Sequence, residues 1–345
     1  MIRIDGSRGE GGGQIIRTAL ALSLYTGKPF AVENIRAGRQ KPGLQNQHLT
    51  CVKAAARIGN ASIDGARLAG REFQFVPQTV QPGDYTFNVG TAGSTMLVFQ
   101  TLLPPLMVAD GKSELLLEGG THNQHAPPFE FIANTFIPLI NKMGAQITIT
   151  LEKYGFYPPG GGKIKISIEP TLNLTGLVFD HRGQTAVSAR SLVVKLPRSV
   201  GERELRVVER MIPKAINRTE VEESSNAISP GNVLLITAAS SQLHETITSI
   251  GERGLPAETV AERACVEANL YLSENVPVGT HLADQLLIPL AMSGSGSFLT
   301  LSPSLHTTTN IEIIQKFLDV EIRIESISST VSRITVEKRH SRTST

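Results

Sequence analysis

The chain has 345 residues, 40% of them hydrophobic, so it is long enough for about two domains and apolar enough to bury a core. Its 33 basic residues nearly balance its 31 acidic ones, and the net charge of +2 excludes a uniformly basic surface for nucleic acid. Any contact with a polyanion must therefore be local.

The only cysteines, Cys51 and Cys265, each lie in an apolar helical pattern. Neither a disulfide framework nor a thiolate zinc site is available, which favours a reducing, intracellular compartment. The N-terminal segment has no apolar signal core, and no run of about 18 apolar residues occurs. We therefore expect a cytoplasmic protein with no membrane-spanning segment.

The first predicted unit begins with the glycine-rich loop GEGGG at residues 9–13. Hydrophobic periodicity and turn residues then predict alternating helices and strands. The predicted elements are a helix over 14–27, a strand over 30–35, a polar loop over 36–43, a helix over 46–59 and a strand over 61–65.

The same order recurs in two further units. The second has helices over 95–111 and 129–144, strands over 113–119 and 145–152, and a polar loop over 121–128; the third has helices over 281–296 and 311–318, strands over 297–302 and 320–326, and a polar loop over 303–310. The repetition predicts an α/β (α+β) fold of three tandem units about a pseudo-threefold axis. The three polar loops would then converge, with His306 on the third.

Residues 184–279 separate the second unit from the third and have strands and helices of their own. This interval predicts a smaller α/β domain inserted in a larger one. The predicted division is a large domain over 1–183 and 280–338, the insertion over 184–279, and a flexible basic tail over 339–345.

Glycines before a helix let the backbone approach an anion, and the free N–H groups of the helix start favour phosphate. The spacing around GEGGG matches neither a dinucleotide fingerprint nor a P-loop. Arg17 stands alone in the apolar run IIRTALALSL, where a guanidinium is costly unless it is paired. An ion pair with Glu10 is the bland explanation, but we favour anion binding.

Arg36, Arg39 and Lys41 crowd into one loop, and no acidic residue occurs from position 36 to 63. Gln47 and His48 follow at the start of a helix. A solvated turn is the alternative, but forked guanidinium donors without acidic neighbours favour phosphate or a nucleic-acid backbone.

Other polar residues are less specific. His122 and His125 have a spacing compatible with metal binding, but no cysteine or carboxylate in their loop completes a zinc site. Asp284 in the first turn of a helix either complements the helix dipole or fixes the tautomer of a nearby imidazole, and spacing does not decide between these roles. His306 alone, among small hydroxylated residues, would be a surface histidine on base rates.

Four stretches taken together resemble the RNA 3′-terminal phosphate cyclases closely and over nearly the full chain: GEGGGQIIR, RAGRQKPGLQNQHLT, HLADQLLIPLAMSGSG and SPSLHTTTNI. The resemblance implies three repeats similar to the C-terminal domain of translation initiation factor three, with an inserted smaller α/β domain. It implies an ATP-dependent enzyme acting on RNA 3′-phosphate ends. An imidazole takes AMP from ATP, passes it to the 3′-phosphate, and the 2′-hydroxyl then expels AMP to leave a 2′,3′-cyclic phosphate.

By the same matching, His306 is the nucleophile and Glu10 holds a divalent metal, Mg²⁺ or Mn²⁺. Binding of ATP or RNA phosphates falls on Arg17, Arg36, Arg39, Gln47, His48, Gln100, Pro127, His281, Asp284 and Gln285. Family members commonly have an aromatic residue before the LADQ motif. His281 replaces it here and offers a smaller face for stacking on adenine.

Two alternatives stand beside this hypothesis. Cyclase-like proteins that lack the nucleophile serve ribosome assembly by binding, and enolpyruvyl-transferring enzymes also use repeated α/β units. The presence of His306, Glu10 and the arginines favours the cyclase. The sequence does not reveal the physiological RNA substrate, the role of the insertion or the oligomeric state.

Overall fold

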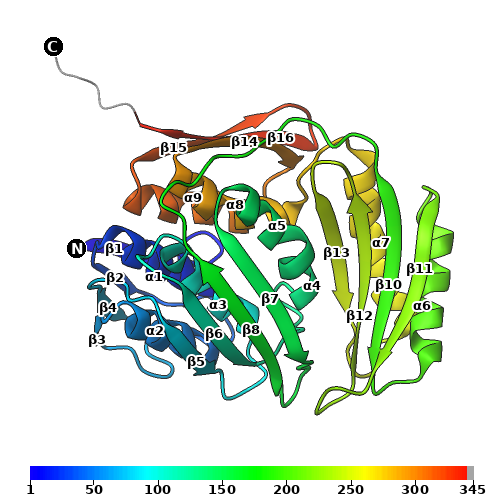
Figure 1. Ribbon diagram of the computed structural model, residues 1–345, viewed down its shortest axis with the longest axis horizontal. Helices are drawn as coiled ribbons and strands as arrows, with labels where there is room; N and C mark the ends of the chain where they lie inside the picture. The colour runs from blue at the N-terminus through cyan, green and yellow to red at the C-terminus, as the bar shows by residue number, and fades with distance from the viewer. Residues whose placement is uncertain (340–345) are drawn as a thin grey trace.

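The computed structural model describes residues 1–339, and the predicted tail over 339–345 lies outside them except for Arg339. Within this range the chain forms four four-stranded mixed sheets with helices packed against them (Figure 1). The fold is mixed α/β, as the sequence predicts.

The first sheet has the strand order β1-β2-β4-β3. β1 and β2 are parallel and joined through a helix, whereas the remaining pairs are antiparallel. The elements are β1 (Ile2–Asp5), α1 (Gly13–Thr26), β2 (Phe30–Glu33), α2 (Asn46–Ile58), β3 (Ser62–Asp64) and β4 (Phe73–Val76).

The second sheet repeats this pattern in the order β5-β6-β8-β7, again with one parallel pair. A single π-helical turn interrupts the helix predicted over 129–144, and the elements are β5 (Asp84–Asn88), α3 (Thr95–Leu106), β6 (Ser113–Gly119), α4 (Phe129–Phe131), η1 (Ile132–Phe136), α5 (Ile137–Lys142), β7 (Gln146–Lys153) and β8 (Gly162–Glu169).

The third sheet, β15-β16-β14-β9, has the same pairing pattern, with one parallel pair, β9 and β14. Its strand β9 is far from the other three in sequence. Its elements are β9 (Val178–Phe179), α8 (Thr280–Ser293), β14 (Ser295–Leu301), α9 (Leu305–Phe317), β15 (Val320–Ser326) and β16 (Val331–Lys338).

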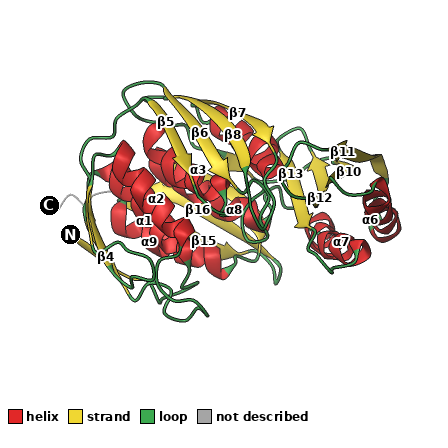
Figure 2. Ribbon diagram, turned by 90° about the horizontal axis from the view of Figure 1, so that it is seen from below, coloured by secondary structure: helices red, strands yellow, loops and turns green. Residues whose placement is uncertain are grey.

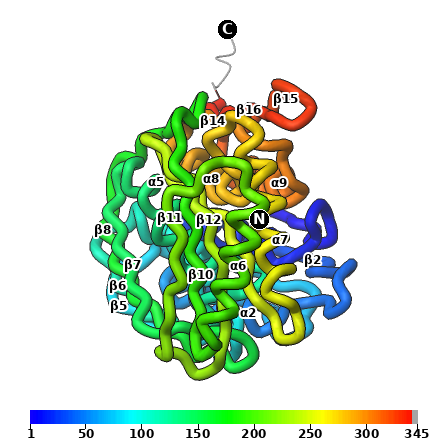
Figure 3. Tube along the Cα trace, turned by 90° about the vertical axis from the view of Figure 1, so that its right-hand side faces the viewer, coloured from blue at the N-terminus to red at the C-terminus, as the bar shows by residue number. Residues whose placement is uncertain are grey.

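The fourth sheet, β11-β10-β12-β13, lies between β9 and α8 in the chain and at one end of the molecule (Figure 1), and Figure 3 views the molecule from that end. Its elements are β10 (Ala186–Val194), α6 (Arg198–Met211), β11 (Ile216–Ser224), β12 (Gly231–Ala239), β13 (His244–Ile250) and α7 (Ala257–Ser273).

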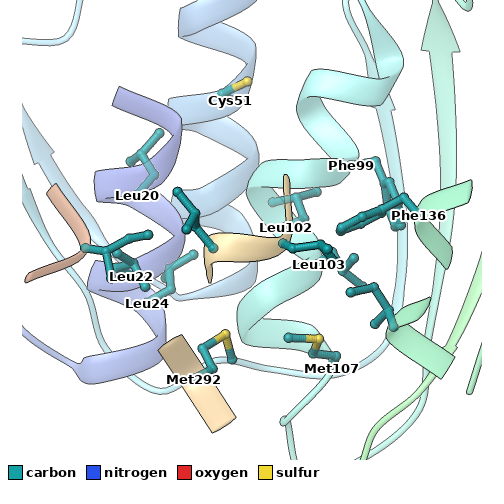
Figure 4. Packing of buried hydrophobic residues seen from close by; sticks show 14 of the residues in the cluster. Leu20, Leu22, Leu24, Cys51, Phe99, Leu102, Leu103, Met107, Phe136 and Met292 are labelled. Atoms are coloured by element: carbon teal, nitrogen blue, oxygen red, sulfur yellow. The ribbon is translucent and has the colours of Figure 1, made fainter. Parts of the chain in front are cut away.

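Burial of apolar side chains joins the first three sheets in one core, with their helices between the sheets (Figure 2). Leu20 on α1, Phe99 and Leu103 on α3, and Met292 on α8 belong to this core (Figure 4). The fourth sheet packs its helices on a core of its own, which includes the buried Cys265. The positions of α1, α8 and α9 are therefore fixed against one another by shared apolar burial.

The start of α9 differs from the sequence prediction, and this changes the setting of His306. Residues 303–310 were expected to form a loop, but α9 begins at Leu305 and places His306 in its first turn. The Ser304 side chain caps the helix by accepting a hydrogen bond from the Thr307 N–H at 3.2 Å. The imidazole therefore stands on a helix start rather than on an irregular loop.

The cysteines and the apolar helices were also the subject of expectations from the sequence. Both cysteines are buried and free. No helix in residues 1–339 combines the length and the apolar character needed to cross a membrane.

Candidate active site

His306 is held by a short relay of hydrogen bonds between three helices. The imidazole Nδ1 lies 2.9 Å from Oε1 of Gln14, on α1. The Gln14 amide nitrogen lies 2.6 and 2.7 Å from the two carboxylate oxygens of Asp284, on α8. Residues that are far apart in the sequence thus form one continuous polar chain.

This relay fixes the tautomer of His306. A carboxylate accepts hydrogen bonds, so the Gln14 nitrogen faces Asp284 and the Gln14 oxygen faces the imidazole. An amide oxygen only accepts, so Nδ1 must carry the proton. The lone pair then lies on Nε2, and the His306 side chain is 56% exposed.

Asn310, one turn further along α9, strengthens the same relay. Its side-chain nitrogen donates to Asp284 Oδ1 at 2.9 Å, and its oxygen accepts from the Thr18 hydroxyl at 2.8 Å. Burial raises the pKa of Asp284, while hydrogen bonds from Gln14 and Asn310 oppose that rise. The three donated hydrogen bonds therefore offset part of the cost of burying a carboxylate at this position.

Glu10 lies on the other side of the imidazole, with Oε1 3.9 Å from His306 Nε2. The glycine-rich loop is tied to α9 here, because the Glu10 N–H donates to the Thr309 hydroxyl at 2.8 Å. Arg39 forms an ion pair with Glu10 Oε1 and also donates to its main-chain oxygen at 2.9 Å. The ion pair predicted as the bland role of Arg17 is therefore made by Arg39.

The second carboxylate oxygen of Glu10 is buried and has no hydrogen-bond partner among the described residues. Such an oxygen is a suitable single ligand for a hard divalent cation. Nowhere in residues 1–339 do three histidine, cysteine or acidic side chains group as a metal site. The donor set therefore fits a cation that takes most of its ligands from phosphate and water, as Mg²⁺ commonly does.

His48 contributes a neutral donor near the glycine-rich loop. Burial, with Arg17 and Arg36 nearby, lowers its pKa to about 3. The Gln45 N–H donates to Nδ1 at 3.0 Å, so the proton of the neutral ring lies on Nε2. Any Cβ at Gly13 would clash with this Nε2 and with Nη1 of Arg17, which shows how closely both groups approach the start of α1.

Arg17 and Arg36 supply charge without a side-chain hydrogen bond or ion pair among the described residues. Burial lowers the pKa of both, and Glu10 partly offsets this for each. Partly buried guanidinium groups left unpaired in this way are suited to an anionic ligand. Together with Arg39, they make the surroundings of Glu10 electropositive.

The remaining predicted residues do not join the His306 relay. Gln47 donates to the Ser94 main-chain oxygen at 3.1 Å and leaves its own oxygen buried and unpartnered within the described part of the chain. His281 is exposed, with Nε2 3.4 Å from Glu267. Partly buried side chains that make no described hydrogen bond are those of Gln100 on α3, Pro127 before α4 and Gln285 on α8.

The two histidines of the loop over 121–128 do not share a site. His122 is buried, with Nε2 2.8 Å from Glu130, whereas His125 is exposed. The contact with Glu130 and stacking on Phe156 give His122 a structural role.

Three polar residues of the site were not predicted from the sequence: Gln14 and Asn310 of the relay, and Thr309, which contacts Glu10. Gln14 follows the glycines directly and is polar at the start of an apolar helix, which was a usable signal. Asn310 and Thr309 would have been found by placing His306 on a helix, because neighbours three and four residues away share a face.

A model of the family described as RNA 3′-terminal phosphate cyclase matches residues 8–324. The chain belongs to this family. It is 48% identical over 340 residues to the RNA 3′-terminal phosphate cyclase of Koribacter versatilis, covering 98% of this chain and 96% of that protein. It is 44% identical over 342 residues to the cyclase of Salmonella agona, covering 99% and 98% respectively.

These findings confirm the prediction of an enzyme of the RNA 3′-terminal phosphate cyclase family and disfavour the two alternatives. Among solved structures, the enolpyruvyl transferase NikO from Streptomyces tendae matches with a TM-score of 0.39 at 11% identity, covering 98% of this chain and 48% of that one. A likeness at that score carries no argument.

Proposed function

We propose that this enzyme converts an RNA 3′-terminal phosphate to a 2′,3′-cyclic phosphate at the expense of ATP, through AMP bound to His306. The observation that carries the mechanism is the fixed tautomer of His306. Its Nε2 lone pair lies near Glu10, whose surroundings Arg17, Arg36 and Arg39 make electropositive. A neutral imidazole is a competent nucleophile near neutral pH, whereas serine or threonine would need a separate base.

In the first step, Nε2 attacks the α-phosphorus of ATP, a P–N bond forms, and pyrophosphate leaves. The imidazole then bears a positive charge. Asp284 stabilises this charge through Gln14, because the Gln14 amide nitrogen binds the carboxylate and its amide oxygen accepts the Nδ1 proton of His306. Arg17, Arg36 and Arg39, with the N–H of His48, bind the phosphates and stabilise the leaving group.

In the second step, an oxygen of the RNA 3′-phosphate attacks the phosphorus of the adduct, the P–N bond breaks, and neutral imidazole is restored. In the third, the neighbouring 2′-hydroxyl attacks the 3′-phosphorus and AMP leaves. The imidazole gains a positive charge in the first step and loses it in the second. Gln14 and Asp284 suit both steps, because the hydrogen bond from Nδ1–H to Gln14 is kept throughout.

Glu10 would hold Mg²⁺ or Mn²⁺ through its unpartnered oxygen. A cation there would neutralise phosphate charge. Within the chain itself, Glu10 orients Arg39 and lies 3.9 Å from Nε2.

The other predicted residues are assigned to the nucleotide. We propose that Pro127 and His281 contact adenine, and that Gln47, Gln100 and Gln285 complete the polar lining. The unpartnered oxygen of Gln47 supports a ligand contact for that residue.

We also propose that the first three sheets are tandem repeats about a pseudo-threefold axis, similar to the C-terminal domain of translation initiation factor three. Their shared strand order supports this proposal. The fourth sheet, with its own core, supports an inserted domain near 184–279 and a large domain over 1–183 and 280–338. Two buried free thiols fit a cytoplasmic setting.

The mechanism is tested by following label from α-labelled ATP. Wild-type protein incubated with ATP and Mg²⁺ should carry label after denaturation. The isolated labelled protein should then give up its AMP on addition of 3′-phosphorylated RNA, without further ATP, and yield cyclic ends.

Two variants make this test specific. His306→Ala should take up no label, whereas the exposed His244→Ala, on β13 of the fourth sheet, should label as the wild type does. Cyclisation of RNA by a protein that never carries label would overturn the covalent mechanism, and absence of both label and cyclisation would favour a binding role.

A further inference from the structure

A second loop lies directly against the arginine-rich loop of the site. The Ile35 N–H donates to the Arg71 oxygen and the Leu44 N–H to the Gly70 oxygen, both at 2.9 Å, while the Ala69 N–H donates to the Leu44 oxygen at 2.8 Å. These bonds hold the segment 65–72 beside the loop over 36–43. Its side chains therefore extend the surface that begins at Arg39 and Glu10.

The cations on this extension are exposed and unpaired. Lys41, Lys53, Arg67 and Arg71 form no ion pair and no side-chain hydrogen bond among the described residues, although Asp64 and Glu72 are near them in sequence. Several exposed arginines elsewhere are instead paired with carboxylates, namely Arg198, Arg203, Arg218 and Arg323. An unpaired group of like charges favours an anionic partner.

A pocket of about 350 Å³ opens between Lys53 and Arg67. Leu49, Val52 and Ile63 line it with apolar surface, and Lys53 and Arg67 line it with charge. Its volume is within the range of small-ligand sites, roughly 300–1,000 Å³. An apolar floor with a cationic rim suits a flat base flanked by phosphates, which is the chemistry of single-stranded nucleic acid.

We propose that this pocket and its rim bind the RNA strand on the 5′ side of the reacting 3′ end. The strand would pass from the site at His306 along Arg39 and Arg36 to Arg71 and Arg67, with Lys53 at the far rim. This inference rests on the proposed function and deepens it. It assigns the nucleotides upstream of the end a binding surface at Lys53, Arg67 and Arg71, beyond the arginines that also bind the phosphates of ATP.

The test compares a long and a minimal substrate on the double variant Lys53→Glu/Arg67→Glu. The substrates are a 3′-phosphorylated oligouridylate of about ten nucleotides, within the span that such surfaces bind, and uridine 3′-phosphate. The expected result is a KM for the oligonucleotide raised about tenfold or more, with the KM for uridine 3′-phosphate unchanged. The slope of log affinity against log salt should also fall by roughly 1.4 for two lost phosphate contacts.

Two readouts separate this proposal from the proposed function. Uptake of label from α-labelled ATP, which needs no RNA, should be unchanged in the variant. The matched control Arg210→Glu/Lys214→Glu carries the same charge change on exposed cations of the fourth sheet and should leave every KM unchanged.

An unchanged KM for the oligonucleotide would overturn the proposal. Equal losses on both substrates would also overturn it, because the pocket would then serve the 3′ end itself. Reduced labelling by ATP would assign the pocket to a free nucleotide instead. Failure of the proposed function would look different, since wild-type protein would then take up no label at all.

Discussion

At the scale of single residues, the proposed mechanism makes Gln14 decide which imidazole nitrogen of His306 reacts. Its amide is oriented by the carboxylate of Asp284, and its oxygen then accepts the Nδ1 proton. Without this oxygen the proton is free to occupy either nitrogen, and a protonated Nε2 cannot attack phosphorus. Gln14 is therefore a positioning residue for the reaction.

Gln14→Leu should slow transfer of AMP to the protein by roughly 10- to 100-fold, the size of effect expected when a reacting group loses its orientation. The measurement is the single-turnover rate of label uptake from ATP as a function of pH, alongside the unfolding temperature. The exposed Gln74→Leu serves as the matched amide control. A wild-type rate and pH profile in Gln14→Leu would show that the relay does not set the tautomer.

The sequence singled out the candidate site residues more readily than it singled out their partners. Glycines, arginines and His306 are visible because each is unusual for its surroundings. The pairing of Arg39 rather than Arg17 with Glu10 depends on how two loops meet in space, and no local pattern contains that information. The same holds for Asp284, whose contact with Gln14 spans 270 positions of sequence.

At the scale of elements, apolar periodicity predicted the long buried helices. It failed at the start of one helix, α9, and at strands on the edges of sheets. The predicted loop over 303–310 is mostly helix, because the Ser304 cap outweighs the modest helix propensity of three consecutive threonines. The strands β9 and β5 were missed, since a two-residue strand and a largely exposed one have no clear alternation.

Helix α8, which carries Asp284, is tied at its start to the fourth sheet. Glu245 on β13 accepts a hydrogen bond from the Gly279 N–H at 2.8 Å, and burial raises the pKa of this carboxyl from 4.5 to about 8. A raised pKa means that folding favours the protonated form. The stability it contributes is complete below about pH 4.5 and is lost as the pH rises through about 8.

Glu245→Gln keeps the acceptor and removes the titration. Its unfolding temperature should therefore fall less than that of the wild type between about pH 6 and about pH 9, with some fall remaining from Glu204, whose pKa burial raises to about 7. Glu258→Gln is the control, because pairing with Arg203 lowers the pKa of Glu258 to about 2, outside this window. Parallel curves for Glu245→Gln and the wild type would contradict the assignment.

At the scale of the whole molecule, three sheets share one core and bring α1, α8 and α9 together around His306. Each of these helices supplies at least one member of the relay. The sequence predicted a repeated order of elements, but the shared strand order of the three sheets is visible only in the strand pairings. The fourth sheet has a core of its own and contacts the start of α8 and the loop over 121–128.

The most direct measurement is the location of AMP on the protein. Wild-type enzyme incubated with ATP and Mg²⁺, without RNA, is digested under conditions that preserve P–N bonds and mapped by mass spectrometry. We predict one AMP, on the peptide that contains His306 and attached through Nε2. AMP on any other residue, or unmodified protein in a preparation that still cyclises RNA ends, would contradict the mechanism.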